Sequence, residues 1–93
     1  MKVLKYGSQG AEVKKYKDML VTLGYLHKST HNFFGLDTDR AVRAFQRAHK
    51  DQYGRQLVVD GKIGELTAWA LNKAYKEREN LPIIPVIRPD VLN

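Results

Sequence analysis

The sequence predicts an all-α fold: a compact three-helix bundle built from two pseudo-repeated turn–helix units. Three segments of the chain carry apolar residues at helical spacing, and glycines stand at the ends of these segments. A short motif also recurs at a constant offset along the chain. With 93 residues, the chain has room for one small domain. We expect this domain over residues 1–79 and a proline-containing tail or linker over residues 80–93.

The first helix is expected to follow the polar, glycine-containing stretch 7–10. Its apolar side chains recur at spacings of three, four and three residues, which places them on one helix face: Val13, Tyr16, Leu20 and Leu23. Ser8 is the expected N-cap, since its hydroxyl can accept a hydrogen bond from an amide of the first turn. Gly24 is expected to end the helix in a left-handed conformation.

The second helix is expected to open at Gly35, with acidic residues in its first turn. Its predicted apolar stripe consists of Ala41, Val42, Phe45, Ala48 and His49. Basic residues fall on the opposite side: Arg40, Arg43, Arg47 and Lys50. This stripe suits an anionic polymer, although an amphipathic helix also presents such a face to water.

The third helix is expected to open at Gly64. Its predicted stripe consists of Thr67, Ala70, Leu71, Ala74 and Arg78. Ahead of it, the β-branched run 57–59 suggests a brief strand, and Asp60-Gly61 indicates a tight turn. Trp69 lies off the stripe, so it requires either a cover or a role. The apolar tail 81–87 could fold over it, or Trp69 could be a sugar-stacking platform or an interface anchor.

The internal repeat aligns residues 34–42 with residues 63–71. The offset is constant, since 64 minus 35 and 67 minus 38 both equal 29. Each copy has an apolar residue, a glycine, a threonine three positions further on, and then a small residue followed by an aliphatic one. We interpret the repeat as one turn–helix unit used twice, with the apolar residue entering the core just ahead of the helix.

Composition narrows the function classes. The chain has no cysteine, which excludes disulfides, iron–sulfur clusters and a thiol nucleophile. Sixteen basic and ten acidic residues give a net charge of +6, which favours an anionic partner. The first residues contain no apolar segment, so we expect no secretory signal there. The apolar runs are too short to span a membrane, so we expect no membrane contact. His27 and His31 lack converging ligands, so we expect no catalytic, metal or cofactor site. His49 is expected to be partly buried with one hydrogen bond.

Read in order, four motifs resemble those of the peptidoglycan-binding domain of bacterial and phage cell-wall hydrolases. They are Gly7-Ser8-x-Gly10-x-x-Val13, Leu23-Gly24-Tyr25, Phe34-Gly35-x-x-Thr38-x-x-Ala41-Val42-x-x-Phe45-Gln46, and Val59-Asp60-Gly61-x-Ile63-Gly64-x-x-Thr67. The resemblance covers about residues 4–75. It implies three α-helices and a non-catalytic module that holds an amidase, peptidase, muramidase or endolysin on murein. Lys17 departs from the family's glutamine and is not expected to reproduce its hydrogen bonds.

The resemblance makes the glycan and stem peptide of peptidoglycan the expected ligands. Repeat symmetry places the two turns beside a common groove at the helix starts, where amide groups suit a carboxylate. The candidate ligand-binding residues come from the loop 25–34, the second connection (residues 51–63, between the second and third helices) and the basic stripe: Tyr25, His31, Asn32, Phe33, Arg43, Tyr53, Arg55 and Asp60.

Two other functions fit the same sequence. A small basic nucleic-acid-binding helical domain would use the arginine-rich helix, although the repeat has no role in it. A regulatory or pro-segment domain would pack on an attached enzyme through Trp69 and the tail. For the leading interpretation we expect a monomer that is tethered to a catalytic domain and binds no nucleic acid. It would reach the bacterial cell wall through a parent protein or through phage lysis.

Overall fold

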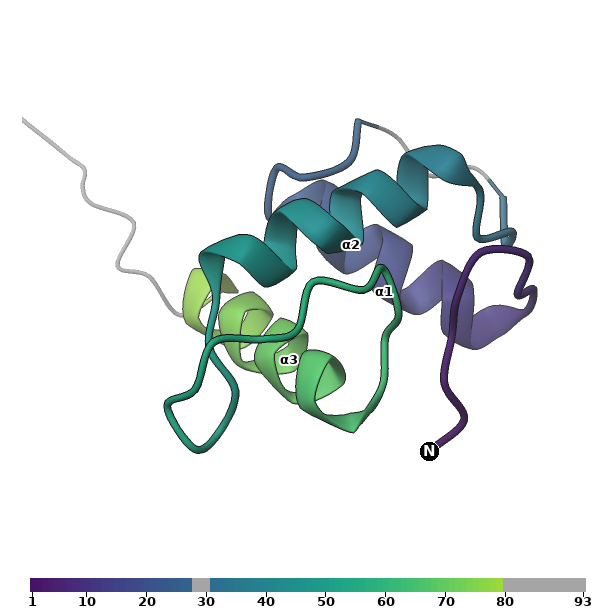
Figure 1. Ribbon diagram of the computed structural model, residues 1–93. Helices are drawn as coiled ribbons and strands as arrows, with labels where there is room; N and C mark the ends of the chain where they lie inside the picture. Colours follow the sequence, from purple (N-terminus) through teal and green to yellow (C-terminus); the bar gives the residue numbers. More distant parts are fainter. Residues whose placement is uncertain (28–30, 80–93) are drawn as a thin grey trace, which may run out of the picture.

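The computed structural model describes residues 1–27 and 31–79, and it contains the three expected helices. They are α1 (Ala11–Thr22), α2 (Leu36–Ala48) and α3 (Glu65–Glu79). Helix α1 packs against both α2 and α3. The connection between α2 and α3 runs along the near face, between those two helices (Figure 1). The all-α three-helix prediction is therefore confirmed.

The helices begin where the sequence predicts, but the capping residue of α1 differs from the prediction. Gly10 is the N-cap there, and no side chain caps the helix. Ser8 is not the cap, because its Oγ accepts a hydrogen bond from the backbone N–H of Lys5, at 3.0 Å, within the preceding turn. Gly24 follows the end of α1 with φ of 90°, as predicted. Gly35 is the N-cap of α2, as its position in the repeat predicted.

The core is formed by the predicted stripes together with the apolar residue ahead of each repeated helix. Phe34 and Ile63 are almost completely buried, which confirms their role in the repeat. The other nearly inaccessible apolar side chains are Val13, Leu20, Val42, Phe45 and Leu71. Two stripe assignments are wrong: Ala48 and Arg78 are exposed, because each lies in the last turn of its helix, beyond the packed core.

The run 57–59 does not form the predicted strand. Within the described residues there are only isolated β-bridges, which pair Leu4 with Ile63, Gln9 with Phe33, and Lys50 with Gln56. In the run itself, the Leu57 side chain is buried and the Val58 side chain points to solvent. The expected tail over residues 80–93, and its packing over Trp69, lie outside the described residues.

The first ten residues lie between the two repeated turns and hydrogen-bond to both. Leu4 exchanges two backbone hydrogen bonds with Ile63, at 3.1 and 2.8 Å. Further along, the Gly7 amide donates to the Phe34 carbonyl, and the Phe34 amide donates to the Ser8 carbonyl, both at 2.9 Å. The two turns are therefore joined through one extended segment, which fixes their relative position.

Candidate functional site

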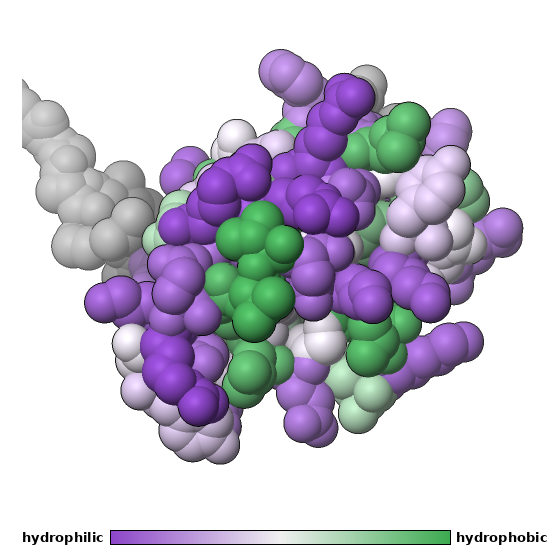
Figure 2. All heavy atoms as spheres, viewed as in Figure 1, coloured by the Kyte–Doolittle hydropathy of each residue, from purple (hydrophilic) through white to green (hydrophobic). Residues whose placement is uncertain are grey.

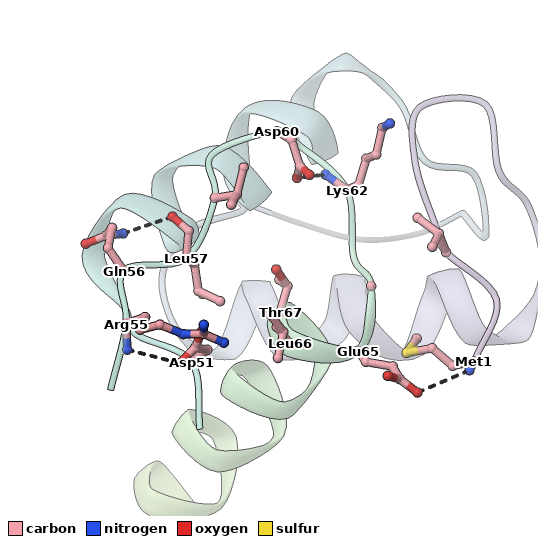
Figure 3. A pocket seen from close by; sticks show the side chains of 13 residues that line it. Met1, Asp51, Arg55, Gln56, Leu57, Asp60, Lys62, Glu65, Leu66 and Thr67 are labelled. Atoms are coloured by element: carbon pink, nitrogen blue, oxygen red, sulfur yellow. Dashed lines mark hydrogen bonds and ion pairs between the residues drawn. The ribbon is translucent and has the colours of Figure 1, made fainter. Parts of the chain in front are cut away.

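An open groove of about 760 Å³ lies between the second connection and the start of α3. The amino-terminal segment closes one side of it. Figure 3 shows the pair Arg55–Asp51 at one end of the groove and Met1 with Glu65 at the other. Figure 2 shows apolar surface on the same face, along the connection between α2 and α3. We take this groove as the candidate ligand-binding site.

The groove has apolar walls. Leu57 is buried at its base, whereas Val58 and Leu66 remain 72% and 39% exposed. Val3, 47% exposed, adds an apolar side chain from the amino-terminal segment. Exposed aliphatic side chains that line a concave surface lose contact with water when a ligand covers them, so this lining favours binding of methyl and methylene groups.

Cationic side chains border these apolar walls. Lys62 is exposed, and its ammonium group makes no ion pair or hydrogen bond with any residue in the described part of the chain. Arg55 lies at the other edge, where its Nε is 3.4 Å from Asp51 Oδ2. The guanidinium is still 69% exposed, so it retains donors for a ligand. The groove can therefore hold an anionic group beside an apolar one.

Asp51 holds the loop that carries Arg55. Its buried carboxylate accepts hydrogen bonds from the backbone N–H groups of Tyr53 (2.8 Å) and Arg55 (3.0 Å). These hydrogen bonds, that of Arg55 foremost, together with the nearby Arg55 guanidinium, outweigh desolvation and hold the pKa of Asp51 below its usual range. The loop is thus fixed from inside by one charged side chain.

Gln46 fixes the other part of the groove wall. Its Oε1 accepts hydrogen bonds from the amides of Asp60 (3.1 Å) and Gly61 (3.0 Å). Its Nε2 donates to Asp60 Oδ1 and to the Lys62 carbonyl, both at 3.0 Å, and lies 3.2 Å from Thr67 Oγ1. A single buried side chain on α2 therefore connects the tight turn to the first turn of α3.

Lys17 makes one contact equivalent to those of Gln46 in the first repeat, but, as expected, it does not reproduce the glutamine's full set of hydrogen bonds. Its Nζ donates to the Phe33 carbonyl at 2.7 Å, as Gln46 donates to that of Lys62. The offset of 29 holds for both partners, since 46 minus 17 and 62 minus 33 are equal. Lys17 replaces only the donor function, because an ammonium group has no acceptor. The first turn therefore lacks the two amide contacts that the Gln46 carbonyl oxygen makes.

The structure brings two of the eight candidate residues into the groove, Arg55 and Asp60. The carboxylate of Asp60 is already used within its own turn, where Oδ1 also accepts a hydrogen bond from the Lys62 amide at 2.9 Å. Arg43 forms an ion pair with Asp39 beside Gly61, at 2.9 Å. Tyr53, 65% exposed, lies next to Arg55, with the guanidinium carbon 5.0 Å from its ring centroid.

The remaining candidates lie elsewhere. Tyr25 packs edge-on against Phe45, with ring centroids 5.6 Å apart. Phe33 lies at the start of α2 against Tyr6, with centroids 6.4 Å apart. His31 and Asn32 precede it and are exposed. None of these residues lines the groove, so the groove borders only the second of the two repeated turns.

Sequence reasoning missed Lys62, Val58, Leu66 and Val3 as lining residues. A signal for Lys62 was present, because the repeat aligns it with Phe33, which was a candidate. His49 behaves as predicted: it is partly buried, and its Nδ1 lies 3.0 Å from the Phe45 carbonyl. Across residues 1–27 and 31–79, no cluster of three or more His, Asp or Glu side chains is placed to hold a metal ion. Nor is any helix in these ranges long and apolar enough to cross a membrane.

A three-helix domain with an open groove lined by aliphatic and cationic side chains has the features of a small ligand-binding module. Comparison with known proteins identifies its kind. The chain belongs to the family described as "Putative peptidoglycan binding domain", whose model matches residues 9–71. It is therefore a peptidoglycan-binding module of the type found in cell-wall hydrolases, and the family resemblance predicted from the sequence is confirmed.

Two solved structures are similar to this chain. The N-terminal domain of SleB superposes with a TM-score of 0.69 at 31% sequence identity, over 80% of this chain and 93% of that one. An endolysin from Burkholderia AP3 phage superposes with a TM-score of 0.66 at 32% identity, over 78% of this chain. This chain covers only 26% of the endolysin. No curated protein sequence matches the chain.

Proposed function

We propose that the groove beside the start of α3 binds the stem peptide of peptidoglycan. We further propose that the chain cleaves no bond itself and holds an attached or neighbouring hydrolase on the wall. The observation that supports this proposal is the combination of exposed aliphatic side chains with the unpaired ammonium group of Lys62. A stem peptide presents alanine methyl groups next to free carboxylates, which match those two features.

Binding at one such groove is expected to be weak. The groove is open, and its cations are exposed, so each ion pair contributes only about 0.2–1 kcal/mol. Peptidoglycan repeats the same peptide along an insoluble polymer, and a tethered hydrolase would be retained by successive rebinding. A monomeric module is sufficient for this role.

Co-sedimentation with intact sacculi at low salt tests the proposal. We expect the wild-type chain to pellet with sacculi and Lys62→Glu to bind roughly three- to tenfold less tightly, which corresponds to about 0.7–1.4 kcal/mol. Lys15→Glu is the matched control, because Lys15 is equally an exposed lysine but lies on α1 and lines no groove. Circular dichroism would verify that both variants are folded.

Three results would contradict the proposal in different ways. If the wild-type chain stays in the supernatant, the binding function is wrong. If both lysine variants lose the same affinity, net charge rather than the groove governs binding. Release of soluble fragments from sacculi by the purified chain would show that it is itself a hydrolase.

A further inference from the structure

A second, smaller cavity of about 360 Å³ lies between residues 49–54 and the exposed side of α3. Asp51 borders both this cavity and the groove. The only tryptophan of the chain lines it, although the proposed peptide-binding groove makes no use of that residue. Its volume is near the lower end of the range for small-ligand sites, about 300–1,000 Å³. It therefore suits a single ring rather than an extended peptide.

The α3 wall of the cavity carries Trp69, Lys73 and Glu77, spaced four residues apart and hence on one helix face. Trp69 is 36% exposed, and the Lys73 ammonium lies 5.6 Å from its ring centroid. The same ammonium is 3.7 Å from Glu77 Oε2. Because the lysine and the glutamate offset each other's charge, this wall combines an aromatic face with polar groups but has no net charge.

The opposite wall is a preorganised loop. The Asp51 carboxylate accepts hydrogen bonds from the backbone amides of Tyr53 and Arg55, and the Gly54 amide donates a hydrogen bond to the Asp51 carbonyl at 3.0 Å. Gln52 is exposed on this loop, and its side-chain amide makes no hydrogen bond with the described residues. Because the loop backbone is already fixed, only the Gln52 side chain loses conformational entropy when its amide binds a ligand, at a cost of about 0.5–1.5 kcal/mol.

We infer that this cavity binds one N-acetylated hexosamine ring of the glycan strand. The apolar face of the sugar packs against the exposed part of Trp69 beside the Lys73 ammonium, and the Gln52 amide and Glu77 carboxylate hydrogen-bond to its hydroxyl and acetamido groups. Over the whole lining, two lysines (Lys50 and Lys73) are balanced by two carboxylates (Asp51 and Glu77), which favours such a neutral, polar ring over a carboxylate or phosphate. The inference rests on the proposed function for the source of the sugar, and it assigns glycan and stem peptide to different cavities.

Trp69 provides a direct readout, because it is the chain's single tryptophan. The full chain is titrated with the N-acetylglucosamine trimer and, separately, with a free stem tetrapeptide. We expect the trimer to shift Trp69 emission to the blue and to protect it from acrylamide, and the tetrapeptide to do neither. Gln52→Ala should weaken the response to the trimer at least threefold. Gln9→Ala is the matched control, since Gln9 is exposed and lines neither cavity.

The outcomes separate this inference from the proposed function. If sacculi retain the chain but the trimer leaves Trp69 emission and quenching unchanged, the sugar site is wrong and the proposed function stands. Protection by the tetrapeptide, or equal losses in the two glutamine variants, would also overturn the sugar site. A response to the trimer that persists in Lys62→Glu would support two separate cavities. Failure to pellet with sacculi would count against the proposed function, and the trimer titration would still decide the cavity.

Discussion

Gly61→Ala should destabilise the domain more than the same substitution at Gly54, another left-handed glycine. Gly61 has φ of 74° and is buried in the turn that borders the groove. A Cβ added there would overlap the Asp39 carboxylate and lie 3.0 Å from Arg43 Nε. Gly54 has φ of 80°, but a Cβ added there would have nothing within 4 Å. The two positions share the backbone conformation and differ in the space available.

The expected magnitudes follow from these two contributions. Placing an alanine in the left-handed region costs about 1–2 kcal/mol at either site. At Gly61 only, the added methyl group also displaces the Asp39 carboxylate, which is the movable end of a side chain, and the weakened ion pair with Arg43 adds about 0.5–1 kcal/mol. Gly61→Ala should therefore lower the unfolding free energy by about 1.5–3 kcal/mol and Gly54→Ala by about 1–2 kcal/mol. For a domain of this size, each kcal/mol corresponds to about 4–8 °C in Tm.

Thermal and urea unfolding of four variants would test this reasoning: G61A, G54A, D39A and the double variant D39A/G61A. Removal of the Asp39 carboxylate makes room for the methyl group, so in the D39A background Gly61→Ala should cost only as much as Gly54→Ala. The ion pair that D39A removes is partly exposed, so D39A alone should cost little, about 0.5 kcal/mol. Steric overlap is not the cause if Gly61→Ala and Gly54→Ala lower the unfolding free energy equally. It is also not the cause if Gly61→Ala is as destabilising in the D39A background as in the wild type.

Three further predictions concern the residues that fix the turns. Gln46→Ala should lower the unfolding free energy by about 2–4 kcal/mol in urea denaturation, because the buried Gly61 amide loses its acceptor; an unchanged midpoint would contradict this. The folded-state pKa of Asp51 is lowered, so its contribution is present above the ordinary carboxyl pKa of about 3.9 and is lost as the pH falls through the lowered pKa. Acid titrations followed by circular dichroism should therefore show a smaller acid-induced loss of stability for Asp51→Asn than for the wild type. Lys17→Met should change the unfolding free energy by only about 1 kcal/mol, because it keeps a packed side chain and removes one hydrogen bond to Phe33; a loss as large as that of Gln46→Ala would refute this.

The three helices and most of the core were predictable because helical periodicity and the repeat carry that information locally. Phe34 and Ile63 were assigned to the core from the repeat alone, and both are buried. Local capping was less predictable. Ser8 has the right residue type for a cap, but the preceding turn uses its hydroxyl first.

The candidate site was predicted only in part because it depends on contacts distant in sequence. Nothing local to Lys62 or Leu66 shows that the amino-terminal segment lies across from them and completes a groove. The same holds for Tyr25, since nothing near it in the sequence shows that its half-buried ring packs against Phe45 of α2, outside the groove. Lys17 shows that a position in a repeat can keep its geometry while its chemistry changes.

The hydrogen bonds by which the first ten residues join the two repeated turns have a practical consequence for engineering. Because Leu4 and Gly7 contact turns that lie 29 residues apart in the repeat, trimming this segment would release both turns in a single step. Met1 and Val3 also form the rim of the groove, so a bulky label attached there would obstruct the entrance. An affinity handle or fluorophore for wall-binding measurements is therefore better placed on the solvent side of α1, for example at Lys15, away from both cavities.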